Sequence, residues 1–231
     1  GLASAVRPHL ALFSAIFAYL CWMSLHRDRR LLLAASVVLG ISIGFRAELP
    51  AILFPLWLWT AWNLGDRRLA AKSLGVIACG VFAYAVSIVV GSGSLGTFWE
   101  SLSRYLIEQT YQSSLLTGAE VMEWKRMVGR NLVWYGAGAL SWIWAAPWGW
   151  RALRQSPHGR RILLFLAIWF LPPFLLSVVF HGAAPGHTLA GQVPLALFGA
   201  VCLCAFEAAV KRRWQPHWPL GAALSLDRKS T

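Results

Sequence analysis

The chain has 231 residues, of which 58% are hydrophobic and only 13% are charged. Soluble domains carry about 25% charged residues, so lipid must solvate the apolar surface that one soluble core cannot bury. The net charge of +12 would suit nucleic acid, but the basic residues are divided among short loops and form no continuous stripe, which excludes that class.

Apolar stretches between the basic loops predict an all-α bundle of about seven transmembrane spans. The predicted spans are 8–25, 31–45, 50–64, 73–92, 131–150, 162–180 and 188–209. They form a transmembrane helical domain over 1–210, which has a long outer loop at about 94–130 and is followed by a cytoplasmic tail over 211–231. Because a crossing needs about 20 apolar residues, the short second and third spans are predicted to form a tight hairpin, with one bent helix as the alternative.

The distribution of Lys and Arg predicts which way the bundle faces. Basic clusters lie at 26–30, 66–72, 151–161 and 211–213. When these clusters and the tail are placed in the cytoplasm, that side holds 15 of the 21 Lys and Arg, and the other side holds six. The positive-inside rule requires this bias. We therefore expect a multi-pass protein with its N-terminus outside and its C-terminus in the cytoplasm.

Small residues inside the spans have structural interpretations. Gly40 and Gly44 are four residues apart, a spacing that lets two helices approach closely. The cysteines lie in apolar stretches without the spacing of metal ligands, and we interpret them as small reduced hydrophobes. They are Cys21, Cys79, Cys202 and Cys204.

The long outer loop is predicted to contain two short amphipathic helices on the membrane surface. Thr97 with Glu100, and Thr117 with Glu120, fit the capping box that begins a helix. Glu100 is also positioned to pair with Arg104 one turn later. These helices could cover a site for a lipid-linked substrate, or they could simply connect two spans.

Two further outer segments carry candidate binding residues. Arg46 and Glu48 form the tip of the predicted hairpin, where Arg46 could hold a phosphate through a bidentate contact. The alternative is an ion pair within the tip. His181 and His187 flank a Pro-Gly turn and could contact substrate or shuttle protons; the alternative is a polar interfacial turn. No third ligand accompanies them, so we predict no metal site there.

The run that contains Gly40, Gly44, Arg46 and Glu48, followed by Pro50 and Pro55, resembles a recurring stretch of GT-C-type membrane glycosyltransferases. Arg7-Pro8 at the start of the first span is similar to that family as well. So are residues 112–118 followed by Asn131, and residues 181–187 followed by Pro194, which resemble the bacterial pattern before the last span. The resemblance covers most of the chain. It departs from the eukaryotic relatives, which have His-Lys-Glu where this chain has His-Gly-Ala.

The resemblance implies transfer of a sugar, of the hexosyl or mannosyl type, from a polyprenyl-phosphate carrier to a glycan, lipid or protein at the outer face. It implies a bacterial cytoplasmic membrane and no nucleic-acid partner. Enzymes of this kind carry their catalytic carboxylate in the first outer loop, so the chain is expected to be a central and C-terminal fragment whose catalytic residues are unknown. No cofactor is certain, and a divalent metal is left open.

Sugar transfer needs cations to stabilise the leaving phosphate and a carboxylate to activate the acceptor. The outer cations available for the first role are Arg46, Arg104, Lys125 and Arg126. Glu48 and Glu108 are the freer outer carboxylates, since Glu100 and Glu120 are predicted to cap helices. The main alternative function is a transporter or flippase, and a third is a membrane scaffold. Span interiors with almost no charge, apart from Glu207, favour the enzyme.

Overall fold

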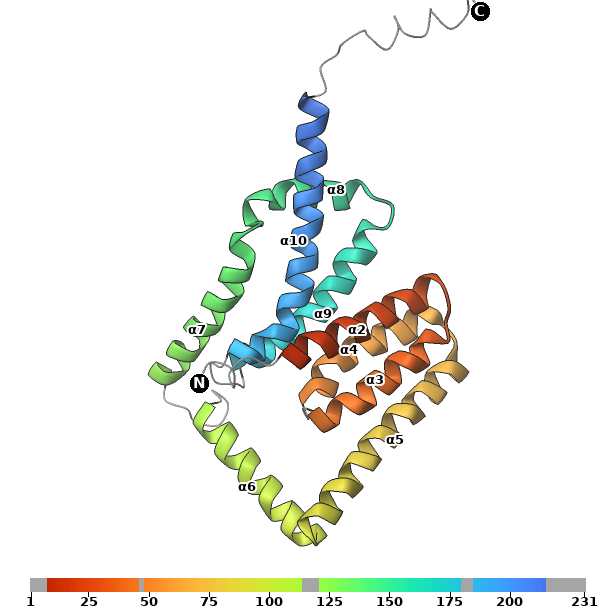
Figure 1. Cartoon of the computed structure of the whole chain (residues 1–231), viewed down its shortest axis with the longest axis vertical. Helices are drawn as coiled ribbons and strands as arrows, with labels where there is room; N and C mark the ends of the chain where they lie inside the picture. The colour runs from red at the N-terminus through yellow and green to blue at the C-terminus, as the bar shows by residue number, and fades with distance from the viewer. Residues whose placement is uncertain (1–7, 46–47, 114–120, 180–184, 215–231) are drawn as a thin grey trace, which may run out of the picture.

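The computed structural model describes residues 8–45, 48–113, 121–179 and 185–214, and this part of the chain is helical without any strand (Figure 1). The predicted all-α class is therefore confirmed. The elements in chain order are α2 (Pro8–His26), α3 (Leu31–Phe45), α4 (Glu48–Leu64), α5 (Arg67–Ser92), α6 (Leu95–Ser113), α7 (Val121–Leu140), the 3₁₀ turn η1 (Ile143–Ala145), α8 (Ala146–Gln155), α9 (Gly159–Val179) and α10 (Pro185–Trp214).

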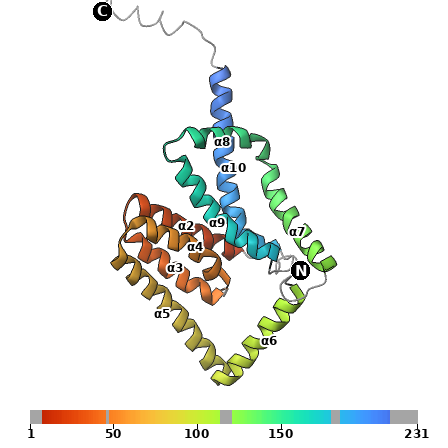
Figure 2. The same cartoon turned by 180° about the vertical axis from the view of Figure 1, so that it is seen from behind.

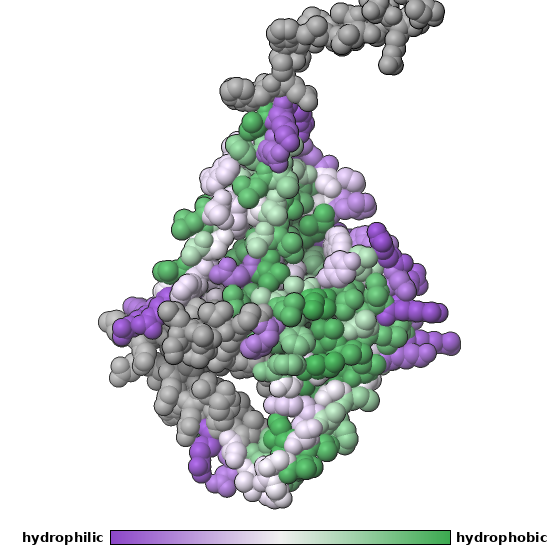
Figure 3. Space-filling model, viewed as in Figure 1, coloured by the Kyte–Doolittle hydropathy of each residue, from purple (hydrophilic) through white to green (hydrophobic). Residues whose placement is uncertain are grey.

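Four of the described helices, α2, α5, α9 and α10, are long and apolar enough to cross a membrane, while α3 and α4 are apolar but shorter. Large apolar side chains also cover much of the surface, as the green areas of Figure 3 show. Trp62 is 84% exposed, Val90 75% and Phe82 71%. An apolar surface of this extent is costly in water and stable in lipid. The helices thus have the features of a membrane protein.

The core lies where α2, α3 and α4 pack on one another and on α9. Phe17, Leu32, Leu39 and Leu56 are fully buried there. The indole of Trp57 in α4 donates a hydrogen bond of 2.9 Å to the Ser36 hydroxyl in α3. The predicted hairpin of two helices is confirmed, and a single bent helix is excluded, because α3 ends at Phe45 and α4 returns alongside it.

Helix α5 packs most extensively on α3, and two glycines allow the close approach. A Cβ added to Gly80 would lie 2.7 Å from the Cα of Gly40. Gly40 was expected to permit such a contact, which is confirmed, and Gly80 is the partner that the sequence pattern did not identify. Without side chains at this point the two backbones touch directly, as in many helix pairs in membranes.

Helices α5 and α6 form a V whose tip, where α5 ends and α6 begins, points away from α2, α3 and α4 in both views (Figures 1 and 2). Asp66 caps the start of α5, since its carboxylate accepts a 3.0 Å hydrogen bond from the Leu69 N–H. Gly93 ends the helix in the left-handed region, with φ of 79°, a conformation that favours glycine. The chain can therefore turn sharply into α6.

The prediction of one helix over 131–150 is wrong. Helix α7 begins at Val121, so the second predicted outer helix and the first half of this span are one helix, and it ends at Leu140. After η1, the chain continues as the short helix α8, which has Pro147 in its first turn. A proline there fits a helix start but would break a continuous helix. Gly149 and Leu153 of α8 are buried, whereas Arg151 and Arg154 are exposed.

We expect Gly80→Ala to lower the free energy of unfolding in detergent by about 1–3 kcal/mol, because the new methyl group would push α5 off Gly40. The matched control is Gly75→Ala on the same helix, where an added Cβ meets nothing within 4 Å. That change should leave stability equal or raise it by up to about 1 kcal/mol, because alanine favours helix. Thermal unfolding of both variants measures the difference; equal behaviour would contradict the proposed crossing.

Candidate functional site

The start of α2 and the end of α3 meet at one end of the bundle. The ring of Phe45, the last residue of α3, lies 4.8 Å from the ring of Phe13 and 6.2 Å from that of His9, measured between centroids. Leu49 in the first turn of α4 is buried. We call this region, where α2 starts, α3 ends and α4 starts, the hairpin end.

Helix α10 also begins near the hairpin end. A buried polar contact in its second turn holds it beside α2. The Ser14 hydroxyl donates to the Ala190 carbonyl at 3.4 Å, and the Trp169 indole N–H donates to the Ser14 oxygen at 2.6 Å. Ser14 and Ala190 each lie in the second turn of their helix. Buried hydrogen bonds are costly to break where no water can replace them. Ser14 thus joins α2, α9 and α10 near the hairpin end.

Helix α7 is attached to the rest of the bundle by two amide side chains. Asn131 is fully buried and donates to the Ser177 carbonyl in α9. Gln192 in α10 donates to the Trp134 carbonyl at 2.7 Å. The exposed Lys125 and Arg126 lie on α7 before these contacts. Their charges therefore lie in the first half of α7, before the residues Asn131 and Trp134 that bond to α9 and α10.

The structure describes some of the predicted site residues and leaves others outside. Arg46 and His181 lie outside the described residues, as do the Thr117 and Glu120 of the second capping box. Glu48 begins α4, Glu108 lies in α6 and His187 lies in the first turn of α10, but their side chains are outside the described part. Arg104, Lys125 and Arg126 are described and exposed. The described side chains are on two helices, α6 and α7, and do not form one cluster.

Helix α6 differs from its predicted start. Ser94 caps it, since the Ser94 hydroxyl accepts a 3.1 Å hydrogen bond from the Thr97 N–H. The prediction that Thr97 and Glu100 form the capping box is therefore wrong. Glu100 instead forms the predicted ion pair with Arg104, at 3.0 Å, with both side chains about 70% exposed. Such exposed pairs contribute at most about 1 kcal/mol, so Arg104 could exchange Glu100 for an anionic ligand at low cost.

Within the described residues, no group of three His, Cys, Asp or Glu side chains could hold a metal ion. The described cysteines are free thiols, and Cys21 and Cys202 are buried. Arg104 on α6, and Lys125 and Arg126 on α7, could offset the charge of a phosphate. Phosphate binding is the role that the sequence analysis predicted for these outer cations.

Sequence reasoning missed a second polar region, at the opposite end of α3 from Phe45. There the loop between α2 and α3 meets the start of α5, and together they enclose a hollow of about 470 Å³. It is lined by residues 27–30 and by Asp66, Arg68, Leu69 and Lys72. We call it the basic hollow. The sequence signal was present in Arg68 and Lys72, one turn apart, but nothing in the sequence showed that the two basic loops are neighbours.

No protein-family model, curated protein or solved structure matches this chain. The arrangement of its own residues therefore carries the functional argument.

The Ser14 contact can be tested by a double-mutant cycle. We expect Ser14→Ala and Trp169→Phe each to lower the free energy of unfolding by roughly 1 kcal/mol, a typical value for a hydrogen bond between helices in a membrane. The double variant should cost clearly less than both changes added together, because one bond cannot be lost twice. Ser87→Ala is the control, since that exposed hydroxyl bonds only within its own helix, to the Ala83 carbonyl. Strict additivity at Ser14 and Trp169 would show that the two side chains do not interact.

Proposed function

We propose that the protein is a membrane glycosyltransferase resembling the GT-C type, which takes a sugar from a lipid-phosphate carrier at the hairpin end. Seven membrane segments, with α3 and α4 as a short hairpin and the basic loops in the cytoplasm, complete the proposal. The apolar helices and their charged connections support this topology.

One observation carries the proposal: three segments that carry the resemblance, although distant in sequence, flank one end of the bundle. Pro8 begins α2, Phe45 ends α3 and Pro185 begins α10. The contact of Phe45 with His9, and that of Ser14 with Ala190, hold these ends together. An enzyme with a site in this place would need such convergence, and the arrangement supports the proposal in this sense.

In the proposed reaction, a hydroxyl oxygen of the acceptor attacks the anomeric carbon of the sugar. The bond from that carbon to the phosphate oxygen breaks, and the lipid phosphate leaves with the bonding electron pair. A carboxylate takes the hydroxyl proton, for which Glu48 and Glu108 are the candidates in this chain. Arg46, Lys125 and Arg126 would offset the charge that develops on the phosphate. Arg104, on α6, is paired with Glu100 in the structure.

The transporter alternative loses its main acidic candidate. Glu207 forms an ion pair of 2.6 Å with Lys211 one turn later, and both side chains are more than 60% exposed. A carboxylate in this setting faces outward at the end of α10 and lines no path through the bundle. Coupling residues of transporters lie near the bilayer midplane, whereas this pair lies toward the end of the apolar stretch Thr188–Arg212.

Replacement of Arg46 tests the proposal. We expect Arg46→Ala to slow sugar transfer by roughly 100-fold or more, a typical loss when one donor to a developing anion is removed. The assay follows release of polyprenyl phosphate from polyprenyl-phosphate mannose in membranes that contain the complete protein. Arg46→Lys should retain part of the activity, because it keeps the charge but not the bidentate contact. The control is Arg151→Ala in α8, an exposed cation away from the hairpin end, which should be as active as the wild type.

Wild-type rates for Arg46→Ala at equal expression would remove Arg46 from the site. Substrate uptake into proteoliposomes without any sugar donor would instead support the transporter and contradict the enzyme.

A further inference from the structure

The lining of the basic hollow contains more cationic side chains than carboxylates. Arg27, Arg29, Arg30, Arg68 and Lys72 line it, and none of them belongs to an ion pair between described residues. The purple side chains at the ends of α2 to α5 in Figure 3 include this region. An anion in the hollow would therefore meet several free cations at once.

The two carboxylates of the basic hollow are already engaged by backbone. Asp28 accepts a 2.9 Å hydrogen bond from the Arg30 N–H, and Asp66 accepts one from the Leu69 N–H as the cap of α5. Each aspartate thus fixes the loop that presents the cations. The hollow also lies at the N-terminal end of α5, a helix of 26 residues, whose dipole adds to the positive potential.

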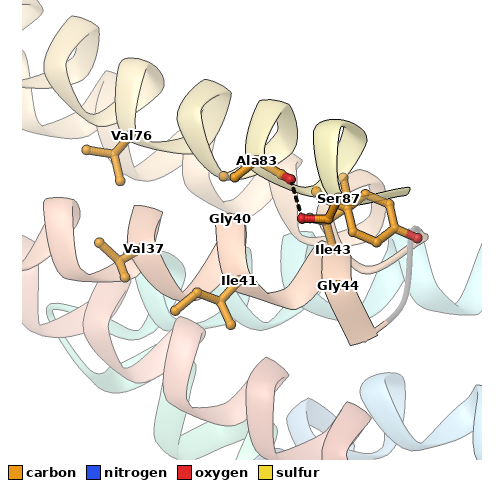
Figure 4. A pocket seen from close by; sticks show the side chains of 10 residues that line it. Val37, Gly40, Ile41, Ile43, Gly44, Val76, Ala83 and Ser87 are labelled. Atoms are coloured by element: carbon orange, nitrogen blue, oxygen red, sulfur yellow. Dashed lines mark hydrogen bonds between the residues drawn. The ribbon is translucent and has the colours of Figure 1, made fainter. Parts of the chain in front are cut away.

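An apolar groove lies between α3 and α5. Its volume is about 320 Å³, and α3 and α5 line it with Val37, Gly40, Ile41, Val76 and Gly80 among others. Figure 4 shows Val37 and Ile41 on α3 and Val76 and Ala83 on α5, which line this groove. Gly40 and Gly80, whose backbones touch where the two helices cross, are part of this lining. We call this region the glycine groove.

The basic hollow and the glycine groove follow one another along α5. Arg68 and Lys72 line the hollow, and Val76, Gly80 and Ala83 line the groove. At 3.6 residues per turn, these five positions fall on one half of the helix surface. A molecule with an anionic head and an apolar chain could therefore contact both regions at the same time.

We propose that the basic hollow and the glycine groove together bind one anionic phospholipid, with its phosphate among the cations and one acyl chain along α3 and α5. Basic pockets between membrane helices recognise such headgroups, and arginine suits phosphate particularly well. A free phosphate would leave the groove empty, and a nucleic acid would place charge against its apolar lining. The basic hollow is at the other end of α3 from the hairpin end, and lipid binding there does not depend on the proposed sugar transfer.

The headgroup half is tested with the full chain in detergent, by native mass spectrometry with phosphatidylglycerol as the probe and phosphatidylcholine as the zwitterionic comparison. We expect Arg68→Ala/Lys72→Ala to weaken phosphatidylglycerol binding roughly tenfold or more, given the usual contribution of each cation. The matched control is Arg151→Ala/Arg160→Ala, which removes two exposed cations from α8 and α9. Its binding should equal that of the wild type. Elution volume and thermal unfolding verify that each variant is folded, and Arg68→Lys/Lys72→Arg should retain binding.

The acyl half is tested by filling the groove. Ala83→Trp should weaken phosphatidylglycerol binding severalfold, whereas Ala78→Trp should not, because Ala78 is exposed on α5 outside the groove. Glycerol phosphate, which has the headgroup chemistry but no acyl chain, should compete poorly with the lipid.

Three results would overturn the proposal. Equal loss of binding in both double-alanine variants would reduce it to general charge attraction. Glycerol phosphate that competes as well as the lipid would show a site for free phosphate. Unchanged binding in a folded Arg68→Ala/Lys72→Ala variant would remove the basic hollow from lipid recognition.

Discussion

A charge inside the hydrocarbon of a membrane is so costly that a spanning helix keeps its ionised groups at its ends. The apolar helices α2, α3, α4, α5, α9 and α10 obey this constraint. The interiors of the described helices contain hydroxyls, amides and indoles that bond to neighbouring helices, such as Ser14 with Trp169 and Asn131 with Ser177. The cations of the apolar helices lie in their terminal turns or in the adjoining loops, whereas Arg104 and Arg130 lie near the middle of α6 and α7. Chemistry that needs charge is therefore restricted to the two ends of the bundle. One end has the basic hollow, and the other is the hairpin end.

The two ends are connected by helix α3. At its start are the basic hollow and the unpaired cations, and at its end Phe45 contacts His9 beside the hairpin tip. Between them, Gly40 meets Gly80, and both line the groove between α3 and α5. A lipid bound at the start of α3 would thus contact the helix whose last residue helps to form the proposed catalytic end.

Most of the helices could be predicted from the sequence, because the apolar stretches of α2, α3, α4, α9 and α10 are separated by charges or by turn residues. The fifth span could not be predicted, because average hydropathy hides two features of this stretch. One is the start of α8 at Ala146, followed by Pro147, and the other is the alternation of buried Leu153 with exposed Arg151. The start of α6 was misplaced for a similar reason, since Ser94 and Thr97 are both good caps and only the contact selects Ser94.

Site residues were harder to predict than helices. The sequence indicated cations for a phosphate, but it could not show which loops become neighbours in space. Arg30 and Lys72 are far apart in the chain and line one hollow, whereas Arg104 and Lys125 are closer in sequence and lie on different helices. The pairing of Gly40 with Gly80 likewise depends on the crossing of two helices, which no local pattern encodes.

The proposed function depends on one claim, that the basic loops and helix α6 lie on opposite sides of the membrane. Labelling of single cysteines tests this claim most directly. In a variant without the four native cysteines, Ser101→Cys on α6 and His158→Cys between α8 and α9 are treated with a membrane-impermeant maleimide. We expect Ser101→Cys to react in intact cells and His158→Cys to react only after permeabilisation. The reverse pattern, or labelling of both positions from one side, would contradict the proposed orientation and leave the sugar-transfer site without its location.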